Sequence, residues 1–335
     1  MIQYGRVICN KQVEVFSLIC AQGLTKRYGD KLALDDASFT VRESEVVGLL
    51  GLNGAGKSTT MNILTGYISA TAGTVSIGGY DIATQPRQAK RITGYLPEQP
   101  AFYPEMKVCD HLDFICGLKG LAAAGRKAHI ADICRRVGLE DVRGRMIRNL
   151  SKGYRQRLGF AQALIGDPKV IILDEPTVGL DPSQIVEIRR LIQDSGRRST
   201  VIVSSHILSE IQAVCGRVIM LQKGRIIADC ATHEMVGRLA AGGRVRVRVR
   251  GEAGAAEAAL CNAPGVGSVR RLAQHEPDAW DFALESADGS DIRAPVFRAL
   301  AAADLPLLAA HGADASLEDA FLSLTAGAAG EEGAP

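Results

Sequence analysis

The chain has 335 residues, of which 47% are hydrophobic and 23% are charged, so its length and composition are those of an ordinary globular protein with room for two domains. Its formal net charge of +2 is too small to indicate nucleic-acid binding. Its eight cysteines are scattered and form no C-x-x-C pair that would indicate a zinc site. No stretch predicts a membrane span and the N-terminus does not resemble a secretion signal, so we expect a cytoplasmic protein with reduced thiols.

Strands and one helix are predicted in the first part of the chain. Residues 1–16 match no motif, and we treat them as an N-terminal extension whose role the sequence does not indicate. Short apolar runs predict strands at 18–21 and 37–41, and the run EVVGLL predicts a strand that ends at Leu50. A helix-compatible run follows at 60–64, so the segment between them has a strand on one side and a helix on the other.

That segment, Gly51 to Thr59, reads GLNGAGKST and fits the phosphate-binding pattern G-x-x-x-x-G-K-[ST]. Its glycines let successive backbone N–H groups turn inward around phosphates. Lys57 supplies a point charge to the β- and γ-phosphates, and the Ser58 hydroxyl is placed to bind Mg²⁺. The loop therefore predicts a bound nucleoside triphosphate without saying which reaction follows. Contacts with the nucleotide are predicted for Gly51, Asn53, Gly54, Ala55, Gly56, Lys57, Ser58 and Thr59.

A helical region is predicted at about 100–165, where apolar residues recur at helical spacing and Gly138 is a suitable helix stop. Pro182 opens a further helix, and a buried strand at 201–203 precedes a helix at 207–214. The alternation of strands and helices up to about residue 240 predicts an α/β core with a largely parallel sheet.

Two adjacent acids follow the apolar run at 170–173, which has the pattern of a buried parallel strand. The carboxyl ends of parallel strands are where ligands bind, so Asp174 is a candidate for holding Mg²⁺ and Glu175 for orienting or deprotonating the attacking water. The alternative is a pair of solvated acids at a strand end. Behind a phosphate-binding loop, we favour the catalytic interpretation.

The composition changes near residue 241, and we expect an accessory domain at 241–326 followed by a disordered tail at 327–335. The run RVRVRVR at 244–250 predicts a strand with one cationic face. That face could bind anionic lipid headgroups, but we favour a solvated strand edge that resists aggregation. Helices are predicted at 295–303 and 317–324.

The segment LSKGY at 150–154 opens a helix and offers a hydroxyl, backbone N–H groups and a helix N-terminus to a phosphate. Here the sequence resembles the ATP-binding subunits of ABC transporters, over about residues 17–240. The resemblance implies a P-loop NTPase fold of the ABC type, with a mixed, largely parallel sheet, a helical subdomain and a small α+β extension. It also implies that Ser151 and Gly153 contact nucleotide held by a second subunit.

Three further residues match the family in the expected order. Tyr28 corresponds to the aromatic residue that stacks on adenine, Asp181 to the D-loop that links two sites, and His206 to the switch histidine that contacts the γ-phosphate. Each has a plainer alternative, because a single tyrosine usually packs, an aspartate before a proline can simply cap a helix, and a histidine after a strand is often on the surface.

The sequence departs from the family pattern in two places. The family usually has a glutamine where this chain has Glu98; Gln99 is one position away, and we favour Glu98 as the residue near Mg²⁺. In the signature segment, Lys152 and Tyr154 replace the commonest glycine and glutamine. Lys152 could add a charge contact, but we favour a side chain that points toward solvent.

The motifs LSKGYRQRLGFAQAL and LDEPTVGLDP resemble the exporter branch of the family, as does the late segment at 316–325. The resemblance implies an ATPase with ATP and Mg²⁺ as cofactors and Glu175 as the base. It further implies a partner ATPase subunit, identical or different, and a polytopic membrane permease that holds this subunit at the inner face of the cell membrane. The alternative is a soluble ABC-type ATPase that acts on nucleic acid or ribosomes, and we expect no nucleic-acid partner.

Overall fold

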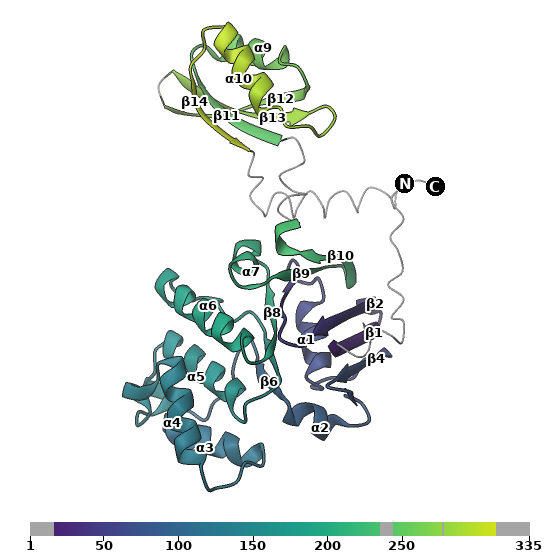
Figure 1. Cartoon of the computed structure of the whole chain (residues 1–335), viewed down its shortest axis with the longest axis vertical. Coiled ribbons are helices and arrows are strands. Elements are labelled where there is room, and N and C mark those ends of the chain that lie inside the picture. Colours follow the sequence, from purple (N-terminus) through teal and green to yellow (C-terminus); the bar gives the residue numbers. More distant parts are fainter. Residues whose placement is uncertain (1–16, 235–243, 277, 313–335) are drawn as a thin grey trace. The chain divides into compact units, whose positions relative to one another are not determined.

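The computed structural model describes residues 17–234, 244–276 and 278–312 of the chain (Figure 1). The chain divides between Ala231 and Thr232 into two compact units. The expected N-terminal extension, the helix at 317–324 and the tail at 327–335 lie outside the described residues.

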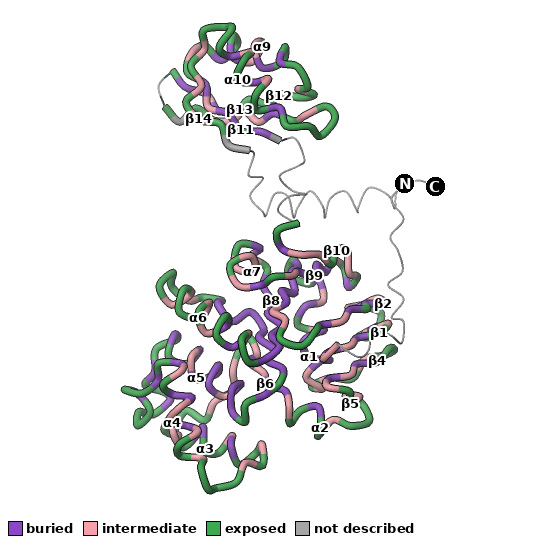
Figure 2. The backbone as a smooth tube through the Cα atoms, in the orientation of Figure 1, coloured by how far each residue is buried: buried purple, intermediate pink, exposed green. Residues whose placement is uncertain are grey.

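A six-stranded sheet forms the centre of the N-terminal unit, in the strand order β10-β9-β3-β8-β7-β6. Five of its strands are parallel to one another, and only β10 runs antiparallel, beside β9. Figure 2 shows that buried residues are concentrated along β6 and β8. The strands are β3 (Val46–Leu50), β6 (Thr93–Leu96), β7 (Val170–Leu173), β8 (Thr200–Ser205), β9 (Arg217–Gln222) and β10 (Arg225–Ala231).

A second sheet of the same unit is antiparallel, in the order β2-β1-β4-β5. The helix α1 (Lys57–Leu64) shares one buried core with both sheets, in which Ile19, Met61 and Ile172 take part. This common core holds the start of α1 in a fixed position beside the parallel sheet. The strands are β1 (Ser17–Tyr28), β2 (Lys31–Arg42), β4 (Ala72–Ile77) and β5 (Tyr80–Asp81), and the short helix α2 (Pro86–Arg91) follows them.

The helices α3, α4 and α5 gather on one side of the unit, away from β1, β2 and β4 (Figure 1). Gly138 ends α4 in the left-handed conformation (φ 67°), as the sequence predicted. Asp181 and Pro182 begin α6 as N-cap and first helical residue. The helices are α3 (Val108–Leu118), α4 (Arg126–Val137), α5 (Lys152–Leu164), α6 (Pro182–Gly196) and α7 (Leu208–Val214), with short 3₁₀ helices at Glu140–Val142 and Ile147–Asn149.

The described part of the C-terminal unit is a four-stranded antiparallel sheet, in the order β12-β13-β11-β14, with the helices α9 and α10. Val247, Phe282 and Leu300 belong to the core between the sheet and the helices. The elements are β11 (Arg244–Arg250), α9 (Ala253–Cys261), β12 (Val266–Glu276), β13 (Ala279–Ser286), α10 (Arg293–Ala302) and β14 (Leu307–Gly312).

The expectation that the arginine-rich strand is an edge strand is wrong. β11 pairs with β13 on one side and with β14 on the other, so it lies inside the sheet. Its valines, for example Val247, enter the core, while Arg246 and Arg248 carry the charge on the other face. The fold class predicted for the chain is confirmed, and none of the helices in the described ranges combines the length and hydrophobicity of a membrane span.

Candidate functional site

Four neighbouring strands of the parallel sheet deliver the polar residues of the site from their carboxyl ends. The phosphate-binding loop follows β3, Glu98 follows β6 after one proline, Asp174 and Glu175 follow β7, and His206 follows β8. Because β3, β8, β7 and β6 are consecutive in the sheet, residues more than 100 positions apart in sequence meet at one edge.

The phosphate-binding loop is shaped by backbone geometry. Gly56 has φ 109°, a conformation that L residues rarely adopt, and a Cβ there would lie 2.8 Å from the carbonyl oxygen of Ala33. No side chain caps α1, which begins at the next residue, so the N–H groups of its first turn are available to an anion. Lys57 is buried, and its Nζ donates to the carbonyl oxygen of Gly51 at 2.7 Å.

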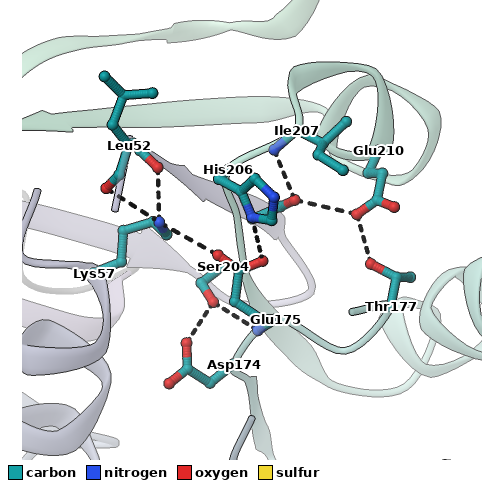
Figure 3. Close-up of polar contacts among 11 residues, drawn as sticks. Leu52, Lys57, Asp174, Glu175, Thr177, Ser204, His206, Ile207 and Glu210 are labelled. Atoms are coloured by element: carbon teal, nitrogen blue, oxygen red, sulfur yellow. Dashed lines mark hydrogen bonds and ion pairs between the residues drawn. The ribbon is translucent and has the colours of Figure 1, made fainter. Parts of the chain in front are cut away.

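Glu175 lies between two basic side chains (Figure 3). Its Oε1 is 3.3 Å from Lys57 Nζ, and its Oε2 is 3.0 Å from His206 Nδ1. The Glu175 backbone has φ 47°, which is uncommon for a residue with a side chain and occurs where the surroundings hold it. The carboxylate, the ammonium and the imidazole are thereby brought to one point at the edge of the sheet.

Asp174 is buried, and its Oδ1 accepts a hydrogen bond of 2.6 Å from Ser204 Oγ. The same Ser204 hydroxyl oxygen accepts the N–H of Glu175 at 2.8 Å, so one serine orients both acids. Burial raises the pKa of Asp174, as do the nearby charges of Glu175 and Glu98, while hydrogen bonds from Ser204 and Ser58 lower it. A buried carboxylate without a full cationic partner is the kind of group that a bound cation would stabilise.

A cavity of about 560 Å³ lies over the phosphate-binding loop. Gly51, Ala55 and Asp174 do not line it, although they are buried next to residues that do. The remaining predicted contacts line it, among them the half-exposed ring of Tyr28, over which Lys26 Nζ lies 5.1 Å from the centroid. Those lining residues are Tyr28, Asn53, Gly54, Gly56, Lys57, Ser58, Thr59, Glu98, Glu175 and His206.

Glu98 and Gln99 line different hollows. Glu98 lines the cavity over the phosphate-binding loop, and Gln99 lines a second cavity that lies between α1, β6 and α3. The geometry therefore places the carboxylate, rather than the amide, beside the phosphate-binding loop.

Ser151, Gly153 and Asp181 do not line the cavity of their own chain. The exposed Ser151 caps α5 by accepting the N–H of Tyr154 at 3.4 Å, and Gly153 is buried against the side chain of Gln184. Asp181 is exposed and caps α6 by accepting the Gln184 N–H at 2.9 Å, as the plainer interpretation predicted. Hydrogen bonds from the Ser183 hydroxyl and the Gln184 N–H lower the pKa of Asp181.

Three residues of the site were not predicted from the sequence. Ser204 joins the two acids, Glu210 accepts hydrogen bonds from two hydroxyl groups near His206, and Gln156 Nε2 donates to the carbonyl oxygen of Pro176 at 2.7 Å. The run of two serines before His206, at the end of an apolar strand, was a usable signal for Ser204. The other two contacts join separate elements, and no local pattern reveals them.

The fold and the loop geometry define a P-loop nucleoside triphosphatase. The family described as ABC transporter matches residues 34–178. A linearmycin resistance ATP-binding protein of Bacillus subtilis is 30% identical over 311 residues, which cover 92% of this chain and 98% of that protein. The chain therefore belongs to the ATP-binding subunits of ABC transporters, and it is an ATPase of that family.

Other relatives match a smaller share of the chain. An uncharacterised ABC transporter ATP-binding protein of Bacillus subtilis, YhcH, is 41% identical and the alignment covers 62% of this chain and 67% of that protein. A Nod factor export ATP-binding protein of Burkholderia orbicola is 35% identical, with coverage of 64% and 71%. A solved ATP-binding subunit of an ABC transporter superposes with a TM-score of 0.61 at 30% identity, over 66% of this chain and 93% of that one.

Proposed function

We propose that this subunit hydrolyses MgATP with Glu175 as the general base. The observation that carries the proposal is the meeting of Lys57 and His206 on the two oxygens of one buried carboxylate, beside a phosphate-binding loop. Glu175 lines the cavity over the phosphate-binding loop, so its carboxylate can accept a proton from a water that attacks the γ-phosphate. Lys57 then has phosphate oxygens as an alternative partner, which would free Glu175 Oε1 for that water.

The donors near the loop fit Mg²⁺. Ser58, Asp174 and Glu98 offer a hydroxyl and two carboxylates, and the raised pKa of Asp174 reflects a buried charge that a cation would stabilise. The described residues contain no cluster of three or more histidine, cysteine or acidic side chains that could hold a metal without other help. Mg²⁺ is usually bound by one or two carboxylates together with substrate phosphates, and when bound it would neutralise the phosphate charge.

The signature segment supports a dimer that closes around two nucleotides. Ser151 and Gly153 stand away from the cavity of their own chain, at the N-terminal end of α5, where the exposed hydroxyl can meet an anion brought by another subunit. Each nucleotide would then be held by one subunit's phosphate-binding loop and the other's signature segment. Release after hydrolysis follows because the γ-phosphate no longer joins the two surfaces.

The second cavity supports a permease partner. It has a volume of about 560 Å³, and its rim includes Tyr67, Gln99 and Lys119 from three separate parts of the unit. Gln99 is adjacent in sequence to Glu98, so a helix of a membrane permease seated there would sense changes at the nucleotide cavity through one loop. The name of the Nod factor export relative supports the direction of export.

The substitution Glu175→Gln tests the proposed base. It keeps the size of the side chain but removes the proton acceptor, so we expect ATP turnover to fall by about 10²- to 10⁴-fold while ATP still binds. The MgATP-bound variant should accumulate as a dimer in light scattering. The same chemical change at an exposed position, Glu43→Gln, is the control. Hydrolysis by Glu175→Gln at the parent rate would show that another group is the base.

A further inference from the structure

A single carboxylate joins the loop after the proposed base to the loop that carries His206. Glu210 Oε2, on α7, accepts the hydroxyl of Thr177 at 2.5 Å and the hydroxyl of Ser205 at 3.1 Å. The Ser205 oxygen in turn accepts the N–H of Ile207 at 3.0 Å. Figure 3 shows the contact between Glu210 and Thr177. Thr177 and Ser205 are both buried, so water does not readily replace these contacts.

The chemistry of the donors makes this link directional. An ionised carboxylate only accepts hydrogen bonds, so both hydroxyl hydrogens must point at Glu210. The Ser205 oxygen is then free to accept the backbone N–H of Ile207, which fixes the turn immediately after His206. The short contact with Thr177 is the length expected for a hydroxyl bound to a charged acceptor.

The loop that Glu210 holds contains a strained residue. Glu175 lies two positions before Thr177 and has φ 47°. Such a conformation persists only where the surrounding contacts over-determine it. The Glu175 N–H donates to Ser204 Oγ at 2.8 Å. At the next residue, the carbonyl oxygen of Pro176 accepts a hydrogen bond of 2.7 Å from Gln156 of helix α5. Thr177 and Glu210 supply a further side-chain anchor.

We propose that Glu210 is a positioning residue for hydrolysis, which keeps Glu175 and His206 in register by tying Thr177 to Ser205. This inference rests on the proposed role of Glu175 as the base. Glu210 does not line the nucleotide cavity, so it acts through the two loops and not on the nucleotide. Loss of the link allows the 3.0 Å contact between Glu175 and His206 to open without changing the phosphate-binding loop.

The test uses four variants of the full chain: Glu210→Ala, Thr177→Val, Thr177→Ser and, as a control on the exposed face of the same helix, Ser209→Ala. Glu210→Ala and Thr177→Val should each lower kcat by about 10- to 100-fold, the effect expected when a reacting group is displaced by a fraction of an ångström. KM for ATP and the affinity for a fluorescent ATP analogue should stay at the parent values, because the phosphate contacts are intact. Thr177→Ser keeps the hydroxyl and should retain most of the activity.

Coupling between variants separates positioning from general destabilisation. The double variant Glu210→Ala/Thr177→Val should be no slower than Glu210→Ala, because both changes remove the same contact. Multiplicative losses, or an equal loss of ATP affinity and kcat, would overturn the proposal, as would a parent rate for Glu210→Ala. If Glu175→Gln itself hydrolyses ATP at the parent rate, the proposed base is wrong. If Glu175→Gln is inactive and Glu210→Ala is not impaired, only the role of Glu210 is wrong.

Discussion

Each of the two units contains a sheet with charged side chains, and the two sheets place them differently. In the N-terminal unit the ionisable side chains of Lys57, Glu175 and His206 gather beside the carboxyl ends of parallel strands and line a cavity. In the C-terminal unit they lie on the face of the sheet. There the buried Asp281 accepts hydrogen bonds from Arg246 at 3.3 Å and from Arg248 at 2.7 Å.

The difference lies in how the buried aspartate of each unit is compensated. Arg248 also pairs with Glu276 at 2.9 Å, so two arginines of the cationic face predicted from RVRVRVR, Arg246 and Arg248, are paired with acids from β12 and β13. At the nucleotide cavity, by contrast, Asp174 has a carboxyl whose pKa is raised by burial and by two neighbouring acids. A run of arginines in sequence is therefore weaker evidence for a ligand than one poorly compensated buried acid.

The largest effect is expected where the site is incomplete within one chain. The substitution Ser151→Arg places a bulky cation at the start of α5, outside the cavity over the chain's own phosphate-binding loop. If the signature segment acts on a partner's nucleotide, hydrolysis should fall by about 100-fold or more, as when one donor to a developing charge is lost. ATP affinity of the isolated subunit should not change, since Lys57 and its loop are untouched.

A mixing experiment sharpens this division of labour. Ser151→Arg combined with Lys57→Ala protein should recover part of the activity, because one mixed interface would pair an intact loop with an intact signature segment. Steady-state phosphate release measured across mixing ratios reports the recovery. A loss of nucleotide affinity in Ser151→Arg alone would contradict the proposed action across subunits.

The second comparison concerns stability of the C-terminal unit. Asp281→Asn removes the charge that Arg246 and Arg248 share, and we expect it to lower the free energy of unfolding of that unit by about 1–3 kcal/mol. Urea denaturation followed through Trp280 fluorescence measures this. Arg250→Gln, at the exposed end of the same strand, is the control. ATP hydrolysis should be unchanged, and a parallel loss of ATPase activity would show that the two sheets are not independent in function.

Much of the site could be predicted from sequence because its motifs are local. The phosphate-binding loop, the two acids after an apolar strand and the histidine after the next strand are each readable within ten residues. Glu98 was harder, because the strand before it, Thr93–Leu96, has only four residues and shows no clear alternation. Its placement beside the phosphate-binding loop depends on β6 pairing with β7, which is a contact between segments far apart in the chain.

Strand extents and strand environment could not be predicted for similar reasons. The strand expected at 18–21 is longer and extends over Ser17–Tyr28. Its full length was not predicted, because register shifts against β2 and β4 interrupt the alternation that marks a strand. The RVRVRVR run was correctly predicted as a strand, but its neighbours come from sequence near residues 280 and 310. Periodicity shows which face of the sheet a residue occupies, but it does not show which strands pair with the strand at its two edges.

The smallest predicted effect concerns Asp174, whose buried carboxylate lowers the stability of the folded protein. Burial holds the pKa of Asp174 above its unfolded value, so the folded state binds more protons and loses stability as pH rises through that interval. Asp174→Asn keeps the acceptor for Ser204 and removes the charge. The nucleotide-free variant should therefore melt about 2–4 °C higher than the parent at pH 7. The gain should disappear in acid, below the unfolded pKa, where the parent carboxyl is protonated in both states.

Scanning calorimetry without Mg²⁺ and ATP, at pH 7 and at the lowest pH where both proteins fold, measures this difference. The reverse order is expected with MgATP, because the parent gains a ligand that Asp174→Asn binds poorly. If the nucleotide-free variant is no more stable than the parent at pH 7, then Asp174 is compensated in the folded state. The contrast with Asp281 would then be lost, since both buried acids would be stabilised by their neighbours in the same way.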